Sequence, residues 1–296
     1  MATLLRSLRA LFALSLYVIN TIFWATPIFI FGLIKLIPIT PVRDFCTLIV
    51  DTCAANWVSV NTAIQKLSHN YQLVIDGDLN LSPKQWYMII ANHQSWVDIL
   101  VLQRALNRRA PFLKFFLKRE LIYVPVLGIA WWALDFPFMQ RYSAQTLRKK
   151  PHLKGKDLET TKRSCAKFKS KPVSVMNFVE GTRFTETKFD SQKPPFTNLL
   201  RPKAGGLAFA LEAMGDQIDT LLDISIYYPN GRPSFWDFLS GNLGKVVVHI
   251  KRISIDESMR GDYANNKTFK NEFQAQLTDL WQQKDKQLDL MKGEHL

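Results

Sequence analysis

Cysteine is scarce in this chain of 296 residues, and its scarcity excludes two kinds of scaffold. Cys46, Cys53 and Cys165 are too few and too scattered for a disulfide framework or a zinc site, so a reducing compartment is the simpler expectation. Cys46 and Cys53 would share one side of a helix, where thiols are more often buried than reactive. The chain also lacks an internal repeat or a long low-complexity tract, so a repeat architecture is not expected.

Acidic residues are the second deficit. The chain has 25 Asp and Glu against 38 Lys and Arg, which gives a formal net charge of +13. This excess attracts anionic partners such as phospholipid head groups, nucleic acid or acidic carrier proteins, and composition alone does not choose among them. With 47% hydrophobic residues the chain can bury a substantial core, and its length is compatible with one domain or two.

Charge is absent altogether from residues 10–34. These 25 residues contain no Asp, Glu, Lys, Arg or His and are flanked by Arg6, Arg9 and Lys35. As a helix rising ~1.5 Å per residue, such a run reaches about 37 Å, enough for a hydrocarbon layer of roughly 30 Å. We therefore predict a membrane-anchoring segment over residues 1–40. A cleaved signal peptide is the lesser alternative, because the apolar run is long and no small-x-small cleavage site closes it.

The way this segment meets the membrane stays open at this point. Pro27 and Gly32 lie late in the apolar run, so a bent helix, or two short helices in one leaflet, fits as well as a straight span. The basic residues before the run are nearly balanced by those after it, so the positive-inside rule gives no orientation.

Beyond the anchor, the pattern predicts one connecting helix and then an α/β domain. Residues 41–70 carry apolar side chains three and four apart, as an amphipathic helix does. From residue 71 to residue 296, short apolar runs alternate with helix-like stretches, which is typical of an α/β core. The predicted strands are residues 72–75, 86–91, 112–117, 136–139, 173–178, 221–227 and 246–255, and the predicted helices are residues 96–106, 156–168, 206–214 and 266–290.

A candidate catalytic pair follows the strand predicted at residues 86–91. Ser95 is a good N-cap, which would place Asp98 at the third helical position while His93 stays in the preceding loop. Asp98 would then fix the tautomer of His93 and leave its other ring nitrogen free to accept a proton. The alternative has equal weight: Asp98 only completes a capping box with Ser95, and His93 is an ordinary loop residue. The other histidines (His69, His152, His249 and His295) have no carboxylate at an informative spacing, and we interpret them as structural or surface residues.

A second motif favours the catalytic interpretation. Residues 178–183 read Phe-Val-Glu-Gly-Thr-Arg and also follow a predicted strand. With Asn92, His93 and Asp98 they make the chain similar to the glycerolipid acyltransferase family, which includes the lysophosphatidate (1-acylglycerol-3-phosphate) acyltransferases. The family's first signature is Asn-His, four residues and Asp, and its third is Phe-Pro-Glu-Gly-Thr-Arg, so Val179 replaces a proline. The resemblance covers residues 71–255 and implies one catalytic domain, residues 71–296, with a central mixed sheet flanked by helices.

Two other family signatures are altered. Where the family has Gly-x-Ile-Phe-Ile-x-Arg, this chain keeps Phe138, Met139 and Arg141 but has Asp135 in place of the glycine. The Val-Pro signature is missing, and residues 222–228, 202–203 and 233–237 look more like the branch that includes lysocardiolipin acyltransferases. This departure puts the acceptor's head group in question and leaves the reaction unchanged.

Several residues are expected to bind substrate. Gly181 permits a sharp turn that would present Glu180 and Arg183 on the side of His93, and an arginine fork suits a phosphate. Lys203, followed by Gly205 and Gly206, would bring a cation and backbone amides to a phosphate, or the glycines would only permit tight packing. The predicted substrate-binding set is Glu180, Gly181, Thr182, Arg183, Lys203 and Arg141. Taken singly, a surface Glu–Arg pair and a solvated Arg141 are the plainer interpretations.

These residues predict an acyltransferase that moves a fatty acyl group from a thioester to the free hydroxyl of a lysophospholipid such as lysophosphatidate. An alcohol is a poor nucleophile at neutral pH, so His93 would act as general base. Backbone amides near Asn92 or Gly181 would stabilise the oxyanion, and Arg183 with Lys203 would anchor the acceptor's phosphate. The resemblance implies direct transfer from acyl-CoA or acyl-carrier-protein. No cofactor is expected, and no metal, because no further ligand stands at a recognisable spacing.

The substrates also predict a location. Lysolipid and product partition into a bilayer, whereas the thioester donor is water-soluble and cytosolic. We therefore expect the catalytic domain on the cytoplasmic face of a membrane, taken as a bacterial inner membrane, with a re-entrant or in-plane N-terminal module. Nothing in the sequence indicates an oligomeric state.

Two rival classes of function fit part of the pattern. A membrane-tethered protein that binds nucleic acid or anionic lipid would explain the net charge and the basic stretch at residues 146–156. We find no recognition helix or aromatic stacking motif, so a nucleic-acid partner is not expected. An acyl-thioester hydrolase would use the same His–Asp pair with water as the acceptor.

Overall fold

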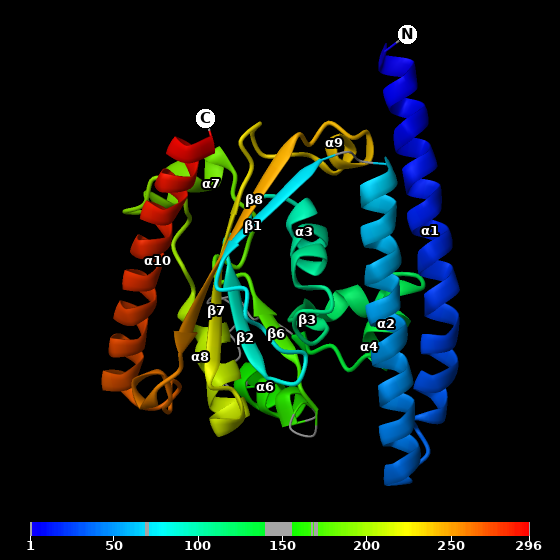
Figure 1. Cartoon of the computed structure of the whole chain (residues 1–296). Coiled ribbons are helices and arrows are strands. Elements are labelled where there is room, and N and C mark those ends of the chain that lie inside the picture. Colours follow the sequence, from blue (N-terminus) through cyan, green and yellow to red (C-terminus); the bar gives the residue numbers. More distant parts are fainter. Residues whose placement is uncertain (1, 69–70, 140–155, 167, 169–170, 296) are drawn as a thin grey trace.

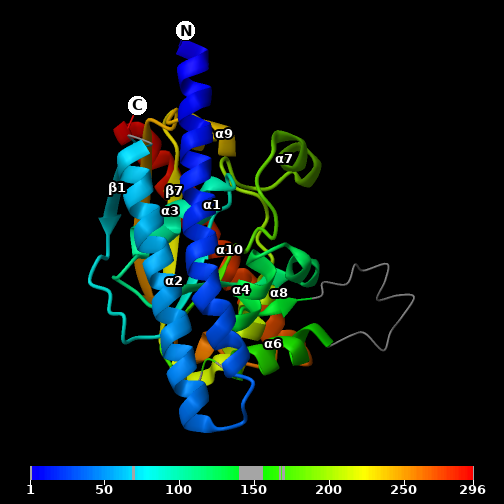
Figure 2. The ribbon, with the colours of Figure 1, turned by 90° about the vertical axis from the view of Figure 1, so that its right-hand side faces the viewer.

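The N-terminal helices form a long antiparallel hairpin along one edge of the molecule. In the computed structural model, which describes residues 2–68, 71–139, 156–166, 168 and 171–295, α1 (Ala2–Ile34) and α2 (Thr40–Ser68) lie side by side (Figures 1 and 2). α1 continues through Pro27 as one helix and is not divided into two short ones. By length and composition it is apolar enough to cross a membrane.

The rest of the chain builds a mixed sheet of six strands. They are β1 (Gln72–Gly77), β2 (Tyr87–Ala91), β3 (Leu113–Phe115), β6 (Ser174–Asn177), β7 (Thr220–Tyr227) and β8 (Lys245–Ser254), in the order β1-β8-β7-β2-β6-β3. β7 and β8 are antiparallel, and the other neighbouring strands are parallel. β4 (Leu117–Lys118) and β5 (Phe138–Met139) form a small separate sheet. The predicted α/β fold with a central mixed sheet is confirmed.

Helices cover both faces of the sheet (Figure 1). α3 (Val97–Leu106), α4 (Leu127–Ala133) and the α1–α2 hairpin share a core with one face, and α6 (Lys156–Ala166), α8 (Ala204–Met214) and α10 (Lys267–His295) share a core with the other. Along β2, Tyr87 and Ile89 pack into the first core and Met88 and Ile90 into the second, so a central strand is apolar at every position. The sequence pattern did not predict short helices α7 (Glu186–Gln192) and α9 (Phe235–Leu239), or the 3₁₀ turns Arg119–Tyr123, Gly215–Gln217 and Glu257–Met259.

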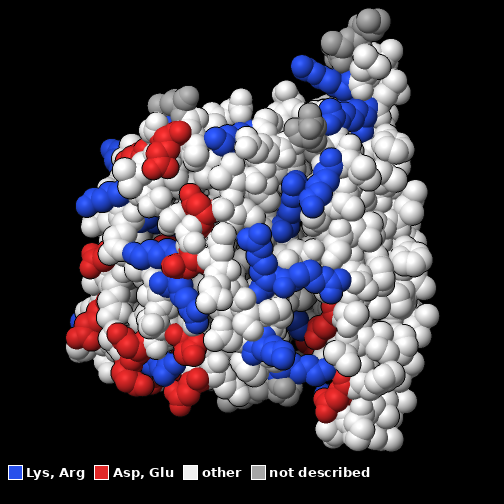
Figure 3. Space-filling model, viewed as in Figure 1, with Lys and Arg blue, Asp and Glu red and all other residues white. Residues whose placement is uncertain are grey.

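The hairpin is fixed to the domain along its length. Near one end the Arg9 guanidinium donates to the Ser68 carbonyl oxygen of α2 and lies against Gly241 of the domain, where a Cβ would come within 2.5 Å of the Arg9 Cζ atom. Near the other end Lys35 forms an ion pair with Asp135. Between them α1 packs on α9 and α4, where a Cβ on Gly32 would come within 2.6 Å of the Ala133 Cβ. The outer side of α1 is apolar and exposed, and in Figure 3 the charged side chains gather over the α/β domain and leave most of this edge bare.

Strand order explains where the conspicuous motifs meet. β2 lies between β6 and β7, and all three are parallel, so their carboxyl ends share one edge of the sheet. The His93 loop follows β2, the turn at residues 178–183 follows β6, and Tyr228 follows β7. Three segments that are far apart in sequence are thereby brought together at the position where α/β sheets place their sites.

Candidate active site

His93 and Asp98 are in direct contact. The His93 Nδ1 atom lies 2.8 Å from the Asp98 Oδ2 atom, and 12% of the histidine side chain is exposed whereas the aspartate is fully buried. A carboxylate on Nδ1 selects the tautomer that leaves Nε2 as an acceptor. The imidazole is stacked on the Phe178 ring, with centroids 3.9 Å apart and planes inclined by 14°. The Nδ1 edge of the ring is therefore held by Asp98, and Nε2 stays available as an acceptor.

The Asp98 carboxylate also organises the loop around the histidine. Its Oδ2 accepts from the backbone N–H groups of Gln94 (2.6 Å) and Ser95 (2.9 Å), and its Oδ1 accepts from the Tyr228 hydroxyl (2.6 Å). Burial raises the pKa of Tyr228 well above its ordinary value, so the hydroxyl remains a donor. The two interpretations of Asp98 therefore coexist, because the same carboxylate caps the loop and holds His93.

The predicted helix start is displaced by one residue. The N-cap of α3 is Trp96, not Ser95, and Asp98 is the second helical residue. Ser95 still contributes, because its hydroxyl accepts from the Val97 N–H at 3.1 Å and donates to the Pro233 carbonyl at 2.6 Å. The displacement arises because Trp96 already has helical backbone angles, φ −60° and ψ −25°.

Glu180 holds the site from beneath. Its side chain is fully buried, and its two oxygens accept from the backbone N–H groups of His93 (2.9 Å) and Leu200 (3.1 Å). Burial, opposed by these two hydrogen bonds, raises the pKa of Glu180 to about 8. In this arrangement Glu180 positions the His93 loop and presents no surface to a substrate, unlike the direct contact we predicted.

Asn92 joins the His93 loop to β7. Its amide donates to the Ile226 carbonyl (2.9 Å) and accepts from the Ile226 N–H (2.8 Å), and the side chain is fully buried. This exchange continues the pairing of β2 with β7 by one step, using a side chain in place of backbone. The sequence analysis assigned Asn92 no such role, and Tyr228 no role at all, because both depend on β7 being the neighbour of β2.

The turn at Gly181 has the conformation that its glycine suggested. Gly181 has φ +70°, and its N–H donates to the Phe178 carbonyl at 2.8 Å. That N–H group is therefore occupied, which weighs against the predicted use of Gly181 as an oxyanion donor. Thr182 accepts from Lys188 Nζ at 2.7 Å, and the exposed Arg183 guanidinium lies 4.4 Å from the centre of the Trp96 ring.

A second arginine lies at the same loop, and the sequence analysis missed it. Arg232 donates through Nε to Gln94 Oε1 and through Nη1 to Glu186 Oε1, each at 2.6 Å. Its guanidinium lies 3.7 Å from the centre of the Phe184 ring. The available signal was a Gly-Arg-Pro turn directly after a predicted strand, which has meaning only once β7 is placed beside β2.

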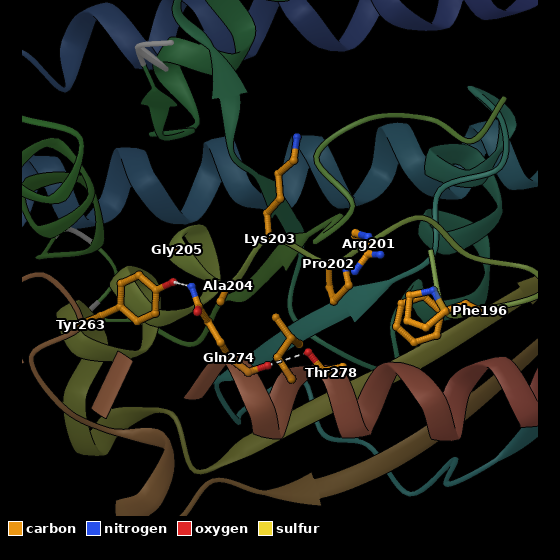
Figure 4. Close-up of a pocket in the computed structure, with 11 residues that line it drawn as sticks. Phe196, Arg201, Pro202, Lys203, Ala204, Gly205, Tyr263, Gln274 and Thr278 are labelled. Atoms are coloured by element: carbon orange, nitrogen blue, oxygen red, sulfur yellow. Dashed lines mark hydrogen bonds between the residues drawn. The ribbon is translucent and has the colours of Figure 1, made fainter. Parts of the chain in front are cut away.

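Lys203 lies next to the third motif but does not join the pair. Its N–H donates to the Val179 carbonyl at 2.7 Å where α8 begins, and its exposed side chain makes no ion pair within the described part of the chain. Figure 4 shows it extending away from Tyr263 and Gln274, which line a cavity of about 460 Å³ between α8 and α10. A Cβ on Gly206 would come within 3.0 Å of Asn177 Nδ2, which favours the packing interpretation of that glycine.

The altered second signature has a physical explanation. Asp135, in the family's glycine position, has φ +58°, a conformation that glycine adopts freely and that aspartate tolerates better than most residues. Its ion pair with Lys35 ties this strained position to α1. Arg141 and most of the basic stretch at residues 146–156 lie outside the described residues.

Neighbouring strands hold a second His–Asp pair. His249 Nδ1 lies 2.7 Å from Asp76 Oδ1, across the β1–β8 pairing. Sequence spacing did not indicate it, because its partners are far apart in the chain. This pair is more exposed than His93–Asp98, with 45% of the Asp76 side chain accessible against none of Asp98, so a short distance alone does not distinguish a catalytic pair. Among the residues described, no group of three His, Cys, Asp or Glu side chains is arranged to hold a metal ion.

Comparison with known proteins agrees with this geometry. A family model described as Acyltransferase matches residues 72–228, slightly more than half of the chain. Probable 1-acyl-sn-glycerol-3-phosphate acyltransferase 5 of Arabidopsis thaliana is 24% identical over 74% of this chain and 59% of its own length. Lysocardiolipin acyltransferase 1 of Danio rerio is 24% identical over 81% of this chain and 61% of its own. The chain thus spans about three fifths of these two relatives.

A solved structure shows the same fold over nearly the whole chain. The crystal structure of the 1-acyl-sn-glycerophosphate (LPA) acyltransferase PlsC from Thermotoga maritima superposes with a TM-score of 0.56 at 18% identity, covering 95% of this chain and 98% of that one. At this identity the match supports the fold alone. The family model, together with the contact between His93 and Asp98, decides the classification: the chain belongs to the Acyltransferase family.

Proposed function

We propose that this protein transfers a fatty acyl group from a thioester to the free hydroxyl of a lysophospholipid such as lysophosphatidate. The observation that carries the proposal is the 2.8 Å contact between His93 Nδ1 and Asp98 Oδ2, next to the turn of the third motif. The names of the relatives, 1-acyl-sn-glycerol-3-phosphate and lysocardiolipin acyltransferases, support the reaction and the class of acceptor.

His93 is the general base in this proposal. Nδ1 is engaged by Asp98, so Nε2 accepts the proton of the acceptor hydroxyl as its oxygen attacks the thioester carbonyl. The buried carboxylate stabilises the imidazolium that forms, and the proton then passes to the departing thiolate. The bond between the alcohol oxygen and the acyl carbon forms first, and the carbon–sulfur bond of the thioester then breaks, without an acyl-enzyme. Stacking on Phe178 keeps the ring in one orientation through both steps.

Residues near His93 supply the phosphate-binding group and the donors to the oxyanion. Arg183 is exposed, its guanidinium fork makes no hydrogen bond to the residues that the structure describes, and it binds the acceptor's phosphate. The backbone N–H groups of Thr182 and Arg183 have no acceptor recorded within the described part of the chain, and they are the proposed donors to the oxyanion. The donor is acyl-CoA or acyl-carrier-protein, and neither a cofactor nor a metal is required by these steps.

The hairpin supports membrane association. α1 contacts the domain near both ends, at Gly241 and at Asp135, so a helix crossing the bilayer would draw α4 and α9 into the hydrocarbon. An in-plane position buries the apolar outer side of α1 and leaves the domain in water. We place the domain on the cytoplasmic face of a bacterial inner membrane, where the soluble donor is found.

The test is acyl transfer by His93→Ala. We expect loss of at least about a hundredfold in turnover, the usual contribution of a positioned base, with an unchanged circular dichroism spectrum. His249→Ala is the matched control, because it removes a histidine paired with an aspartate at 2.7 Å and is expected to retain activity. Products are separated by mass spectrometry, so that acylated lysolipid and free fatty acid are counted independently.

Two outcomes would contradict the proposal. Near-normal transfer by the His93 variant would remove the base. Release of free fatty acid at a rate independent of added lysolipid would identify a thioester hydrolase.

A further inference from the structure

Arg232 lies at the catalytic loop without a role in the reaction described above. It follows β7 and reaches the loop after β2 through the hydrogen bond from Nε to Gln94 Oε1. The same two segments also meet where the Ser95 hydroxyl donates to the Pro233 carbonyl and the Tyr228 hydroxyl donates to Asp98. The position of the guanidinium is therefore set by the scaffold that sets the position of His93.

The guanidinium is held in place and still has donors to offer. Stacking on the buried Phe184 ring fixes its plane, and the bonds to Gln94 and Glu186 use Nε and one side of Nη1. Nη2 has no hydrogen-bond acceptor recorded within the described residues, and 40% of the side chain is exposed. A cation with a fixed plane and free N–H groups loses little conformational entropy when it binds an oxyanion.

The Arg183 guanidinium is held in a similar way. Its guanidinium lies over Trp96, as that of Arg232 lies over Phe184. Trp96 and Gln94 both belong to the short segment between His93 and α3, so each arginine is attached to the catalytic loop through one of its side chains. Two guanidinium groups with free donors are thus attached to the five residues from His93 to Val97.

From this arrangement we infer that Arg232 forms part of the acceptor subsite and binds an anionic oxygen of the lysolipid head group together with Arg183. The subsite then selects lysophospholipids whose head group carries net negative charge over zwitterionic ones. A phosphate diester or monoester satisfies either arginine, but a head group with its own ammonium places a cation against them. This inference rests on the proposed function, because it names the acceptor class of the same site.

Glu186 is the competitor already in place. Its carboxylate pairs with Arg232, but its side chain is 71% exposed. Exposed ion pairs are weak, since water and salt screen them, so a bound head group can replace or share this partner. Glu186 therefore separates the two roles of Arg232: if the arginine only fastens α7, removing Glu186 weakens the site, and if it binds the head group, removing Glu186 does not.

The kinetic experiment compares three acceptors in mixed micelles of equal composition: 1-acylglycerol-3-phosphate, lysophosphatidylglycerol and lysophosphatidylcholine. For Arg232→Gln we expect kcat/KM with each anionic acceptor to fall about tenfold, mainly through KM, the loss of one charge-assisted contact. The value for the zwitterionic acceptor is expected to change less than about twofold. Arg232→Lys restores part of the anionic preference, and Glu186→Gln maintains or raises it.

A matched control removes a surface arginine elsewhere. Arg163 on α6 pairs with Glu159 at 3.3 Å and is exposed, so Arg163→Gln deletes the same charge without touching the site. We expect no change in preference for that variant. An equal fall in kcat/KM for all three acceptors in Arg232→Gln would show that the arginine only positions Gln94. Unchanged kcat/KM values for all three acceptors would remove the arginine from the subsite.

A binding measurement separates this inference from the proposed reaction. In the His93→Ala background, tryptophan fluorescence follows the binding of 1-acylglycerol-3-phosphate without turnover. Arg232→Gln in that background is expected to weaken binding about tenfold. If wild-type protein transfers no acyl group while this loss of affinity is present, the reaction fails and the anion subsite stands; if binding is unchanged, the subsite fails whatever the reaction.

Discussion

Asp98 concentrates the function of the site in one carboxylate. Four donors converge on it: two backbone N–H groups, the Tyr228 hydroxyl and His93 Nδ1. Sequence spacing allowed the contact between His93 and Asp98, because both residues lie around one helix start, and the second motif favoured it over the capping interpretation. Tyr228 was out of reach, since its contribution depends on which strand lies beside β2. His93 and Asp98 are thus close in sequence, whereas Tyr228, which donates to Asp98, is far from both.

Glu180, which holds the His93 loop, lowers the stability of the fold at alkaline pH. Burial raises its pKa from 4.5 to about 8 in the folded protein. A carboxyl group whose folded pKa is raised stabilises the fold fully at pH values below its unfolded pKa, and this stabilisation is lost as the pH rises through the folded value. At alkaline pH the fold therefore contains a buried ionised carboxylate, which lowers its stability. The same carboxylate holds the His93 loop in place.

Glu180→Gln tests this pH dependence. We expect the difference in free energy of unfolding, wild type minus variant, to decrease by roughly 3–5 kcal/mol between pH 4.5 and pH 8.5. The measurement is urea denaturation in mild detergent at several pH values, followed by circular dichroism. Glu257→Gln, which removes a carboxylate at an exposed position, is the control. A flat difference for Glu180→Gln would mean that burial does not raise the pKa of its carboxyl group.

At the scale of elements, α10 supports the site from the opposite face of the sheet. Asp285 accepts from the N–H groups of Thr197 and Asn198, each at 2.8 Å, and Trp281 Nε1 donates to the Leu200 carbonyl at 3.0 Å. Leu200 in turn donates to Glu180, which holds His93. The C-terminal helix is therefore connected to the His93 loop through the irregular segment at residues 197–200 and the Glu180 carboxylate.

Asp285→Asn interrupts this connection. One carboxylate oxygen becomes an NH₂ group that faces a backbone N–H, so we expect a loss of about 1–3 kcal/mol in the free energy of unfolding and a lower kcat. Asp279→Asn, an exposed aspartate on the same helix, is the control. Stability and turnover are measured side by side for both variants. If Asp285→Asn matched Asp279→Asn in both, α10 would have no part in supporting the site.

Most elements were predictable and their assembly was not. The predicted strands agree with β1, β2, β6, β7 and β8 to within two residues, because period-two patterns and continuous apolar runs are local signals. α10 is different: it carries Lys284, which is fully buried and lies 2.5 Å from Asp223, and burial lowers its pKa. Lys284 is internal because α10 packs on β7, and local sequence pattern does not predict that contact.

At the scale of the whole molecule, the proposed membrane association depends on the apolar outer side of α1. Both ends of α1 should lie on the same side of the bilayer if the helix lies in plane. Single cysteines at Arg6→Cys and Thr40→Cys are then both labelled by an impermeant maleimide in sealed vesicles of one orientation and neither in the other. The three native cysteines are buried, so they give little background, and the unsubstituted protein serves as control. Labelling of the two positions in opposite orientations would show that α1 crosses.

The attachments at Arg9 and Lys35 have a consequence for the choice of host bilayer. In the proposed in-plane position, a helix held to the domain at Gly241 and at Asp135 would not tilt to match the hydrocarbon thickness, as a free transmembrane helix does. Immersion depth would then be a property of the protein, and His93 would stand at the same height over thin and thick leaflets.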